Sequence, residues 1–251
     1  LRGNVRTVAI DGKFDDCQAM VKQAFADPTL QCIPLSSAYS INIGRLLPQS
    51  IYYFYAASRL AQPGEPIVFS VPSGNFGDMM GAVVARQMGL PIRKLVTSVN
   101  DNDAFPRFLA TGHYEKVVPS RNSVSNAMNV GHPSNLARLV MVYGGRMDET
   151  GRIHQLPDLA AMRRDLFSSS ISDERTRVTI REVWTKYRLL LEPHGAVAWR
   201  GFQDWQEQES LNGLPAVILE TANPAKFPEE IEKNMGWSPD VPPAMAAAIQ
   251  Q

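Results

Sequence analysis

The segment from residue 67 to residue 99 constrains the fold more than any other part of the chain. Residues 67–71 (Ile-Val-Phe-Ser-Val) form an almost uninterrupted apolar run, which is typical of a strand buried on both faces. A helix is expected to follow and to end near Met88, just before Gly89, and residues 93–99 predict a second strand. The two strands of such a βαβ unit run parallel. The sequence therefore predicts an α/β fold, with a mostly parallel sheet and helices on both of its faces.

Hydrophobic periodicity and turn residues predict further elements along the chain. The expected strands are residues 5–10, 32–35 and 216–219. The expected helices are residues 15–26, residues 43–61, a helix that is capped by Ser172 and runs to about Leu191, and a helix that opens at His194. Acidic and basic residues are interspersed through residues 146–188, which favours a solvated helical insertion near residues 146–190.

The charge balance excludes several classes of function. Lys plus Arg number 25 and Asp plus Glu number 25, so the formal net charge is zero. A nucleic-acid partner is not expected, because such partners normally require a basic excess. No apolar run approaches the ~18 residues of a membrane span, so no membrane partner is expected either. The two cysteines, Cys17 and Cys32, and the four histidines show no metal-ligand spacing. We expect no metal site and a reducing, cytoplasmic setting.

The turn Ser73-Gly74-Asn75-Phe76-Gly77-Asp78 lies between the first strand of the βαβ unit and its helix. Glycines let backbone N–H groups approach an anion closely, and the start of the helix adds unpaired N–H donors and the positive end of the helix dipole. A phosphate group suits such a turn. The turn is not a P-loop, a G-x-G-x-x-G motif or a G-x-S-x-G motif. On spacing alone, a plain βα turn without a ligand stays open.

Two residues of this turn carry specific expectations. A β-branched side chain at Gly77 is expected to block the approach of a phosphate and any positive-φ geometry. Asp78 is expected to turn its carboxylate away from the anion while its N–H points inward.

Six stretches of the chain, in order, resemble motifs of threonine synthases, which are pyridoxal-phosphate (PLP) enzymes. Residues 71–78 resemble the loop with which this family grips the cofactor phosphate. The other five are Ser40-Ile41-Asn42-Ile43-Gly44-Arg45 with Leu47-Pro48-Gln49, residues 100–103 with 106–109, Ser125-Asn126-Ala127-Met128, residues 192–197, and residues 221–227. The resemblance covers nearly the whole chain, and together the motifs are highly specific.

The resemblance implies a lyase of threonine biosynthesis that converts O-phosphohomoserine and water to L-threonine and phosphate. It implies PLP as the cofactor and PLP fold type II, which is similar to the β-subunit of tryptophan synthase. Residues 1–28 would end the smaller lobe, and residues 29–251 would form the large lobe. The expected partner is a small phosphorylated amino-acid substrate.

The resemblance also assigns site residues. The expected cofactor-binding residues are Ser73, Gly74, Asn75, Phe76, Gly77, Asp78 and Thr221. The Thr221 hydroxyl is expected at the ring nitrogen, and the alternative that it caps the turn at Asn223-Pro224 stays open. The expected substrate-binding residues are Ser40, Asn42, Arg45, Asn100, Asn102, Asp103, Arg107, Ser125 and Asn126, among which the two guanidinium groups suit phosphate and carboxylate. For His194, a structural hydrogen bond is favoured over catalysis.

The family's catalytic lysine is missing from the motifs found here. That Schiff-base lysine lies in an F-K-D-like motif, and none of the seven lysines of this chain does. We do not assign its role to Lys226, which belongs to a closing motif. We therefore expect the catalytic lysine upstream of Leu1, in a missing N-terminal part of the same protein, and we expect this chain alone to be inactive. The alternative is a non-catalytic phosphate-binding α/β domain that is related to PLP enzymes.

Overall fold

The computed structural model describes residues 3–249 and centres on a parallel four-stranded sheet. The strand order is β5–β2–β1–β6, and all three pairings are parallel. The strands are β1 (Ile67–Pro72), β2 (Ile92–Ser98), β5 (Leu166–Phe167) and β6 (Ala216–Ile218). Strand β1 is buried along its whole length, as its apolar run predicts. The predicted fold class, a mostly parallel sheet with helices, is confirmed.

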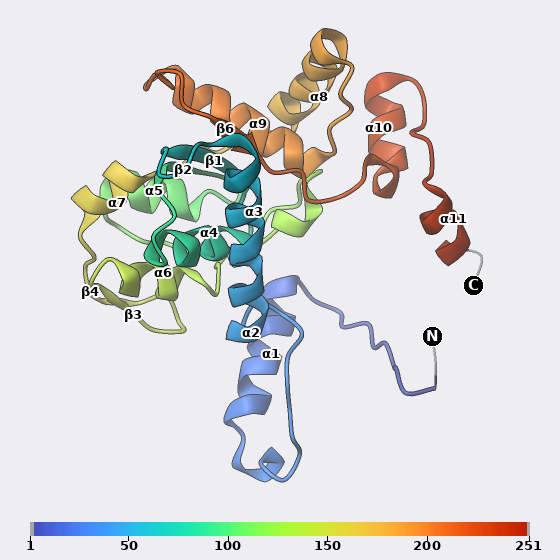
Figure 1. Cartoon of the computed structure of the whole chain (residues 1–251). Coiled ribbons are helices and arrows are strands. Elements are labelled where there is room, and N and C mark those ends of the chain that lie inside the picture. The colour runs from blue at the N-terminus through green and yellow to red at the C-terminus, as the bar shows by residue number, and fades with distance from the viewer. Residues whose placement is uncertain (1–2, 250–251) are drawn as a thin grey trace.

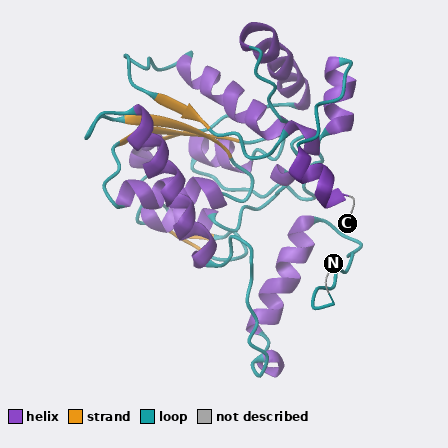
Figure 2. Cartoon of the chain, turned by 45° about the vertical axis from the view of Figure 1, so that its right-hand side comes forward, coloured by secondary structure: helices purple, strands orange, loops and turns teal. Residues whose placement is uncertain are grey.

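Helices cover both faces of the sheet (Figures 1 and 2). On one face, α9 (Pro193–Gln206) packs on β1, β2 and β6, and α8 (Asp173–Tyr187) packs on α9. The opposite face is covered by α4 (Gly77–Gln87), against which α3 (Ser50–Leu60) packs. Alternate side chains of β1 pack against the helices on opposite faces of the sheet. Phe69 belongs to the same apolar cluster as Met79 of α4, whereas Val68 packs with Trp205 of α9.

The remaining elements surround this three-layer core. Helix α1 (Phe14–Ala26) and the segment after it extend away from the sheet, as Figure 1 shows. The other helices are η1 (Pro28–Leu30), α5 (Ala104–Thr111), η3 (Asn126–Met128), α6 (Leu136–Val142), α7 (Leu159–Asp165), η4 (Pro224–Lys226), α10 (Pro228–Met235) and α11 (Pro243–Ile249). Strands β3 (Arg146–Met147) and β4 (Ile153–Gln155) form a separate antiparallel pair. Between residues 3 and 249, no helix has the length and apolar character that crossing a bilayer requires.

Two predicted strands are absent from the described residues. Residues 5–10 are extended but exposed, with Val8 76% exposed, and residues 32–35 form no strand either. The physical reason is the same for both segments. No described strand pairs with them, and an extended segment becomes a strand only through its partners. The predicted division into lobes at residue 28, and the insertion near residues 146–190, stay predictions.

The predicted helices form, but two have different limits. The helix expected over residues 43–61 is divided into α2 (Ile43–Leu46), the 3₁₀ turn η2 (Leu47–Gln49) and α3. Pro48, which has no N–H to donate, lies within η2. The helix after Ser172 is capped as expected, since Ser172 accepts the Arg175 N–H, but it ends at Tyr187 because Arg188 adopts a left-handed conformation (φ 57°).

Gly201 permits the close packing of α9 on the sheet. A Cβ atom at this position would overlap the Ser98 hydroxyl and lie 2.5 Å from the Ser98 Cβ. Gly201→Ala should therefore lower the free energy of unfolding by about 1–3 kcal/mol, even though alanine favours a helix over glycine. Urea unfolding measures this effect, with Gln206→Ala on the exposed side of α9 as the control. Unchanged or increased stability of Gly201→Ala would contradict the packing described here.

Candidate functional site

Three parallel strands end at one edge of the sheet, and a predicted motif follows each of them. The turn 73–78 follows β1, Asn100 follows β2, and Thr221 follows β6. The ends lie side by side, because the Leu219 N–H donates to the Ser70 carbonyl (2.9 Å) and the Ser73 N–H donates to the Ser98 carbonyl (2.8 Å). In open α/β sheets, ligands bind beyond the carboxyl ends of the strands. This edge is the candidate site.

The turn 73–78 directs backbone N–H groups toward one region. Phe76 has a left-handed conformation (φ 62°, ψ 19°), which its buried ring supports by an edge-to-face contact with Phe105 (4.9 Å between centroids). Among the described residues, the N–H groups of residues 75–78 have no protein acceptor. A left-handed residue before a helix aligns successive N–H groups for an anion. The positive-φ residue of this turn is Phe76, and Gly77 does not have a positive φ.

Side chains around the turn hold it in place instead of facing a ligand. The Ser73 hydroxyl donates to the Val71 carbonyl (3.0 Å). The Asn75 side chain donates to Ser40 Oγ (2.9 Å) and accepts the Ser134 N–H (2.7 Å). A Cβ at Gly74 would lie 2.8 Å from the Met128 Cα, so glycine is required there for close packing. The backbone of the turn is thus the part that remains available to an anion.

Asp78 directs its carboxyl group away from the turn, toward α3. The Tyr53 hydroxyl donates to Asp78 Oδ1 (2.9 Å) and lies 3.1 Å from the Asp78 carbonyl oxygen. Burial raises the pKa of Asp78, and the hydrogen bond from Tyr53 offsets part of that rise. The orientation of the carboxyl group away from the turn and its raised pKa both reduce the repulsion that this acid would exert on an anion bound at the start of α4.

The predicted residues Ser40, Asn42 and Arg45 lie beside the turn or on α2. Ser40 Oγ also accepts from the Asn135 side chain (3.0 Å), and Arg138 donates to the Ser40 carbonyl (3.0 Å). The Asn42 side chain caps α2 by accepting the Gly44 N–H (2.9 Å). Arg45 is exposed and has no ion-pair partner within residues 3–249. Of these three, Arg45 has its polar group free.

Three other predicted residues, Asn100, Asn102 and Ser125, are buried and form hydrogen bonds with other residues of this chain. Asn100 donates to Ser125 Oγ (3.2 Å) and to Asn129 Oδ1 (3.0 Å), while its own oxygen accepts from the Asn102 side chain (2.8 Å). Asn100 and Ser125 have no exposed surface. Their amide and hydroxyl groups hold the segment 125–128 beside the turn. Asn126, in contrast, is exposed.

The structure pairs Asp103 with Arg107 on α5. Arg107 Nε lies 3.2 Å from Asp103 Oδ1, and its Nη1 lies 3.5 Å from Glu115 Oε2. Two acids therefore already neutralise this guanidinium group. Asp103 is the residue before α5 and makes no side-chain cap bond to that helix.

Thr221 meets a buried carboxylate. Its hydroxyl lies 3.4 Å from Glu192 Oε1, so it does not cap the turn at Pro224, which Asn223 caps by itself. Glu192 is fully buried and also accepts the N–H groups of His194 (2.8 Å) and Gly195 (2.9 Å). His194 Nδ1 bonds Glu192 Oε2, and the Ala127 N–H donates to His194 Nε2 (3.1 Å). The structural hydrogen bond favoured for His194 is present at both of its nitrogens.

Glu220, next to Thr221, carries a second carboxyl group at this edge. Its Oε1 accepts the Glu192 N–H (2.7 Å), and a Cβ at Gly195 would lie 2.5 Å from its Cδ. Burial of the carboxyl group against α9 raises the pKa of Glu220 to about 8, and the nearby charge of Glu192 adds to the rise. The residue as a whole is exposed. The raised pKa favours the protonated form of Glu220 at neutral pH.

Sequence reasoning missed several of these contributors. Asn135 and Arg138 lie three residues apart around the start of α6, and both contact the segment that bears Ser40. Their i, i+3 spacing alone does not distinguish them from ordinary surface residues. Glu192 lies inside a motif that the resemblance singled out, but its role as a buried acceptor depends on burial.

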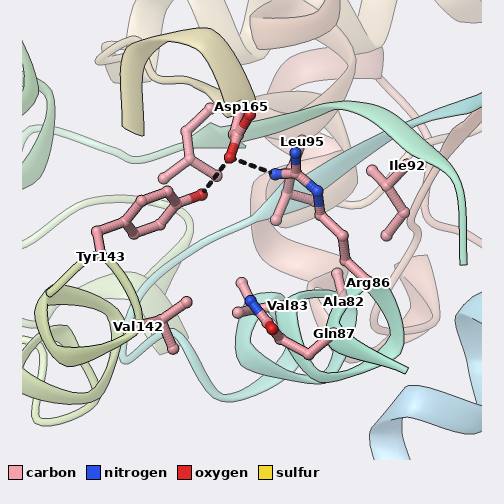
Figure 3. Close-up of a pocket in the computed structure, with 10 residues that line it drawn as sticks. Ala82, Val83, Arg86, Gln87, Ile92, Leu95, Val142, Tyr143 and Asp165 are labelled. Carbon is pink, nitrogen blue, oxygen red and sulfur yellow. Dashed lines mark hydrogen bonds and ion pairs between the residues drawn. The ribbon is translucent and has the colours of Figure 1, made fainter. Parts of the chain in front are cut away.

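A pocket lies apart from this edge, at the opposite end of α4 (Figure 3). Arg86 Nη1 pairs with Asp165 Oδ2 (2.7 Å), and the Tyr143 hydroxyl donates to the same oxygen (3.2 Å). None of the predicted site residues lines this pocket. Over residues 3–249, no group of three or more His, Cys, Asp or Glu side chains is arranged to bind a metal ion.

Comparison with known proteins confirms the resemblance to threonine synthases. Residues 195–251 match the family model "Threonine synthase, C-terminal". The chain is 42% identical to threonine synthase of Serratia marcescens over 98% of this chain and 53% of that protein. It is 41% identical to threonine synthase of Escherichia coli K12, over 98% of this chain and 54% of that protein. The chain thus spans about half the length of the curated relatives that it matches.

Solved structures give the same result. The crystal structure of threonine synthase from Escherichia coli matches with a TM-score of 0.84 and 39% identity, over 98% of this chain and 54% of that one. PLP-bound threonine synthase from Brucella melitensis matches with a TM-score of 0.85 and 35% identity, over 99% of this chain and 55% of that one. The chain therefore has the fold of half of a threonine synthase.

The raised pKa of Glu220 predicts a pH dependence of stability. The folded carboxyl group has a pKa of about 8, against an ordinary value of 4.5, so between these pH values the folded state holds a proton that the unfolded chain has released. The stability contributed by this group is complete below pH 4.5 and is lost as the pH rises toward about 8. Glu220→Gln should remove this loss. Melting temperatures across this pH range measure it, with the exposed Glu207→Gln as control. Parallel profiles for wild type and Glu220→Gln would contradict the prediction.

Proposed function

We propose that this chain is the C-terminal part of a threonine synthase, and that the complete protein converts O-phosphohomoserine and water to L-threonine and phosphate with PLP as its cofactor. One observation carries the proposal. The free N–H groups of residues 75–78 lie at the same sheet edge as Thr221, in a chain that is similar to threonine synthases over 98% of its length. A cytoplasmic setting and the lobe boundary at residue 28 are part of the same proposal.

The residues at this edge fit PLP at both of its ends. The N–H groups of residues 75–78 and the positive end of α4 suit the cofactor phosphate. The Thr221 hydroxyl would face the ring nitrogen, where a hydroxyl can form a hydrogen bond without adding charge. When bound, PLP supplies an electron sink for carbanions at the substrate. The contribution of this chain is to hold and orient the cofactor.

The substrate anions require cationic groups. Arg45 suits this role because its guanidinium group is exposed and unpaired within the described part of the chain, and because α2 begins only three residues after Ser40. Arg107 would have to exchange its contacts with Asp103 and Glu115 for a ligand. We therefore assign the substrate phosphate or carboxylate to Arg45 first. The buried Asn100, Asn102 and Ser125 position the neighbouring backbone, while Asn126 is accessible to a substrate.

An exposed apolar face supports a further segment of the same protein as partner. Ile43, Leu47, Ile51 and Tyr55 recur every four residues along α2, η2 and α3 and are each 50–68% exposed, with Tyr52 beside them at 59%. No acidic residue occurs between residues 43 and 60. A helix that is apolar on its outer side is normally buried. Because the relatives are about twice as long as this chain, we propose that their additional half covers this face in the complete protein and supplies the catalytic lysine. The chain alone would then be inactive.

The substitution Gly77→Val tests the cofactor site in the complete protein. A Cβ at Gly77 would lie 3.1 Å from the Ser40 Cβ, so a valine would displace the turn and obstruct its N–H groups. The affinity for PLP should fall by about tenfold or more. Titration of the apoprotein with PLP measures it, with the exposed Gln208→Val as the control for added bulk.

The wild-type titration tests the proposed function separately. The complete protein should bind PLP with a visible absorption band and release threonine and phosphate. Absence of both would favour the alternative, a non-catalytic phosphate-binding α/β domain. Binding that Gly77→Val leaves unchanged would mean that the residues 73–78 form a plain turn.

A further inference from the structure

A continuous path of contacts connects Thr221 to the turn 73–78. The Thr221 hydroxyl approaches Glu192, Glu192 bonds the His194 ring, and the His194 ring accepts the Ala127 N–H. Ala127 in turn lies against the turn, because a Cβ at Gly74 would be only 3.0 Å from the Ala127 carbonyl oxygen. The path therefore connects Thr221, which suits the ring nitrogen of the cofactor, with the turn 73–78, which suits its phosphate.

Each link of this path has a single arrangement. The Ala127 N–H donates to His194 Nε2, so Nε2 carries no proton, and the proton of the neutral ring is on Nδ1, where it is donated to Glu192. Rotation of the ring would break both bonds. His194 is 4% exposed, and its ring packs beside the Phe227 ring at 5.3 Å between centroids. The imidazole is therefore fixed in both orientation and tautomer.

Glu192 is suited to its place as a charged anchor. It precedes α9, where the free N–H groups and the dipole of a fourteen-residue helix favour a negative charge. Four donors reach its carboxylate: the N–H groups of His194 and Gly195, the His194 ring and the Thr221 hydroxyl. A buried carboxylate is tolerated only when its acceptors are satisfied in this way.

The far end of the path is also held firmly. Asn100 bonds the Ser125 hydroxyl, which fixes the start of the segment that includes Ala127. The Met128 Cα would lie 2.8 Å from a Cβ at Gly74, so the segment and the turn are in close contact and have no room to approach further. A displacement at His194 would thus be transmitted to the turn.

We propose that Glu192 and His194 are positioning residues that set the distance between Thr221 and the turn 73–78, so that both ends of the cofactor are held at once. The inference rests on the proposed PLP site and assigns the two residues no contact with the ligand. The carboxylate of Glu192 and the imidazole of His194 would thus couple Thr221 to the turn 73–78.

Two half-substitutions at His194 break the path at different links. His194→Asn retains a donor toward Glu192 but loses the acceptor for Ala127, whereas His194→Gln retains an acceptor near Ala127 but loses the donor to Glu192. Glu192→Gln keeps the shape and removes the charge. In the complete protein each should weaken PLP binding by about tenfold, the loss expected for one charge-assisted hydrogen bond. The controls are His154→Asn, in the β3–β4 hairpin, and the exposed Glu207→Gln, which should stay within about twofold of wild type.

Amide hydrogen exchange distinguishes positioning from general stability. In each test variant the amide of Ala127 should exchange faster, together with amides of the turn 73–78, at temperatures well below melting of the apoprotein. A lower melting temperature with unchanged PLP affinity and unchanged exchange at the turn would overturn the proposal. If PLP fails to bind even the wild type, the proposed function fails, and exchange at Ala127 still tests the link.

A double-substitution cycle tests the coupling itself. Thr221→Val and Glu192→Gln, alone and together, should weaken PLP binding non-additively, because both remove the same end of the path. The PLP affinity of the double variant should be close to that of whichever single variant binds PLP less tightly. Fully additive losses would show that Thr221 acts independently of Glu192 and would overturn the proposal.

Discussion

The parallel pairing of β1 with strands on both sides is the constraint on which the rest of the structure depends. It aligns the carboxyl ends of β1, β2 and β6 at one edge of the sheet, although these strands are far apart in sequence. The turn 73–78, Asn100 and Thr221 come together for that reason alone. The crossover from β1 through α4 to β2 also places the start of α4, with its unpaired N–H groups, at this edge.

The sequence was most informative where local pattern and tertiary context agree. Three local sequence features correctly predicted the elements that contain them. They are the apolar run of β1, the capped start of α8 at Ser172 and the start of α9 at a proline. Residues 5–10 and 32–35 show the opposite case. Their composition favours strands, but a strand depends on a partner, and the residues described here provide none.

The site residues could be predicted as a set but not by role. Serine and asparagine in family-like motifs suggested contacts with cofactor or substrate, yet Asn75, Asn100 and Ser125 use their side chains to bond one another or nearby loops. Whether a polar side chain faces a ligand or a neighbour depends on burial, which residue type and spacing do not encode. The left-handed conformation of Phe76 could not be predicted either, because glycine, not phenylalanine, normally marks such a position.

We propose that this chain holds and orients PLP, while the catalytic lysine belongs to another part of the complete protein. Lys226, the lysine nearest to Thr221 in the sequence, is exposed at the end of the turn η4. The most direct measurement is borohydride reduction of the complete protein with PLP, followed by mass spectrometry of its peptides. We expect a single PLP-modified lysine outside residues 1–251. A stoichiometric adduct on Lys226, or on any other lysine of this chain, would contradict it.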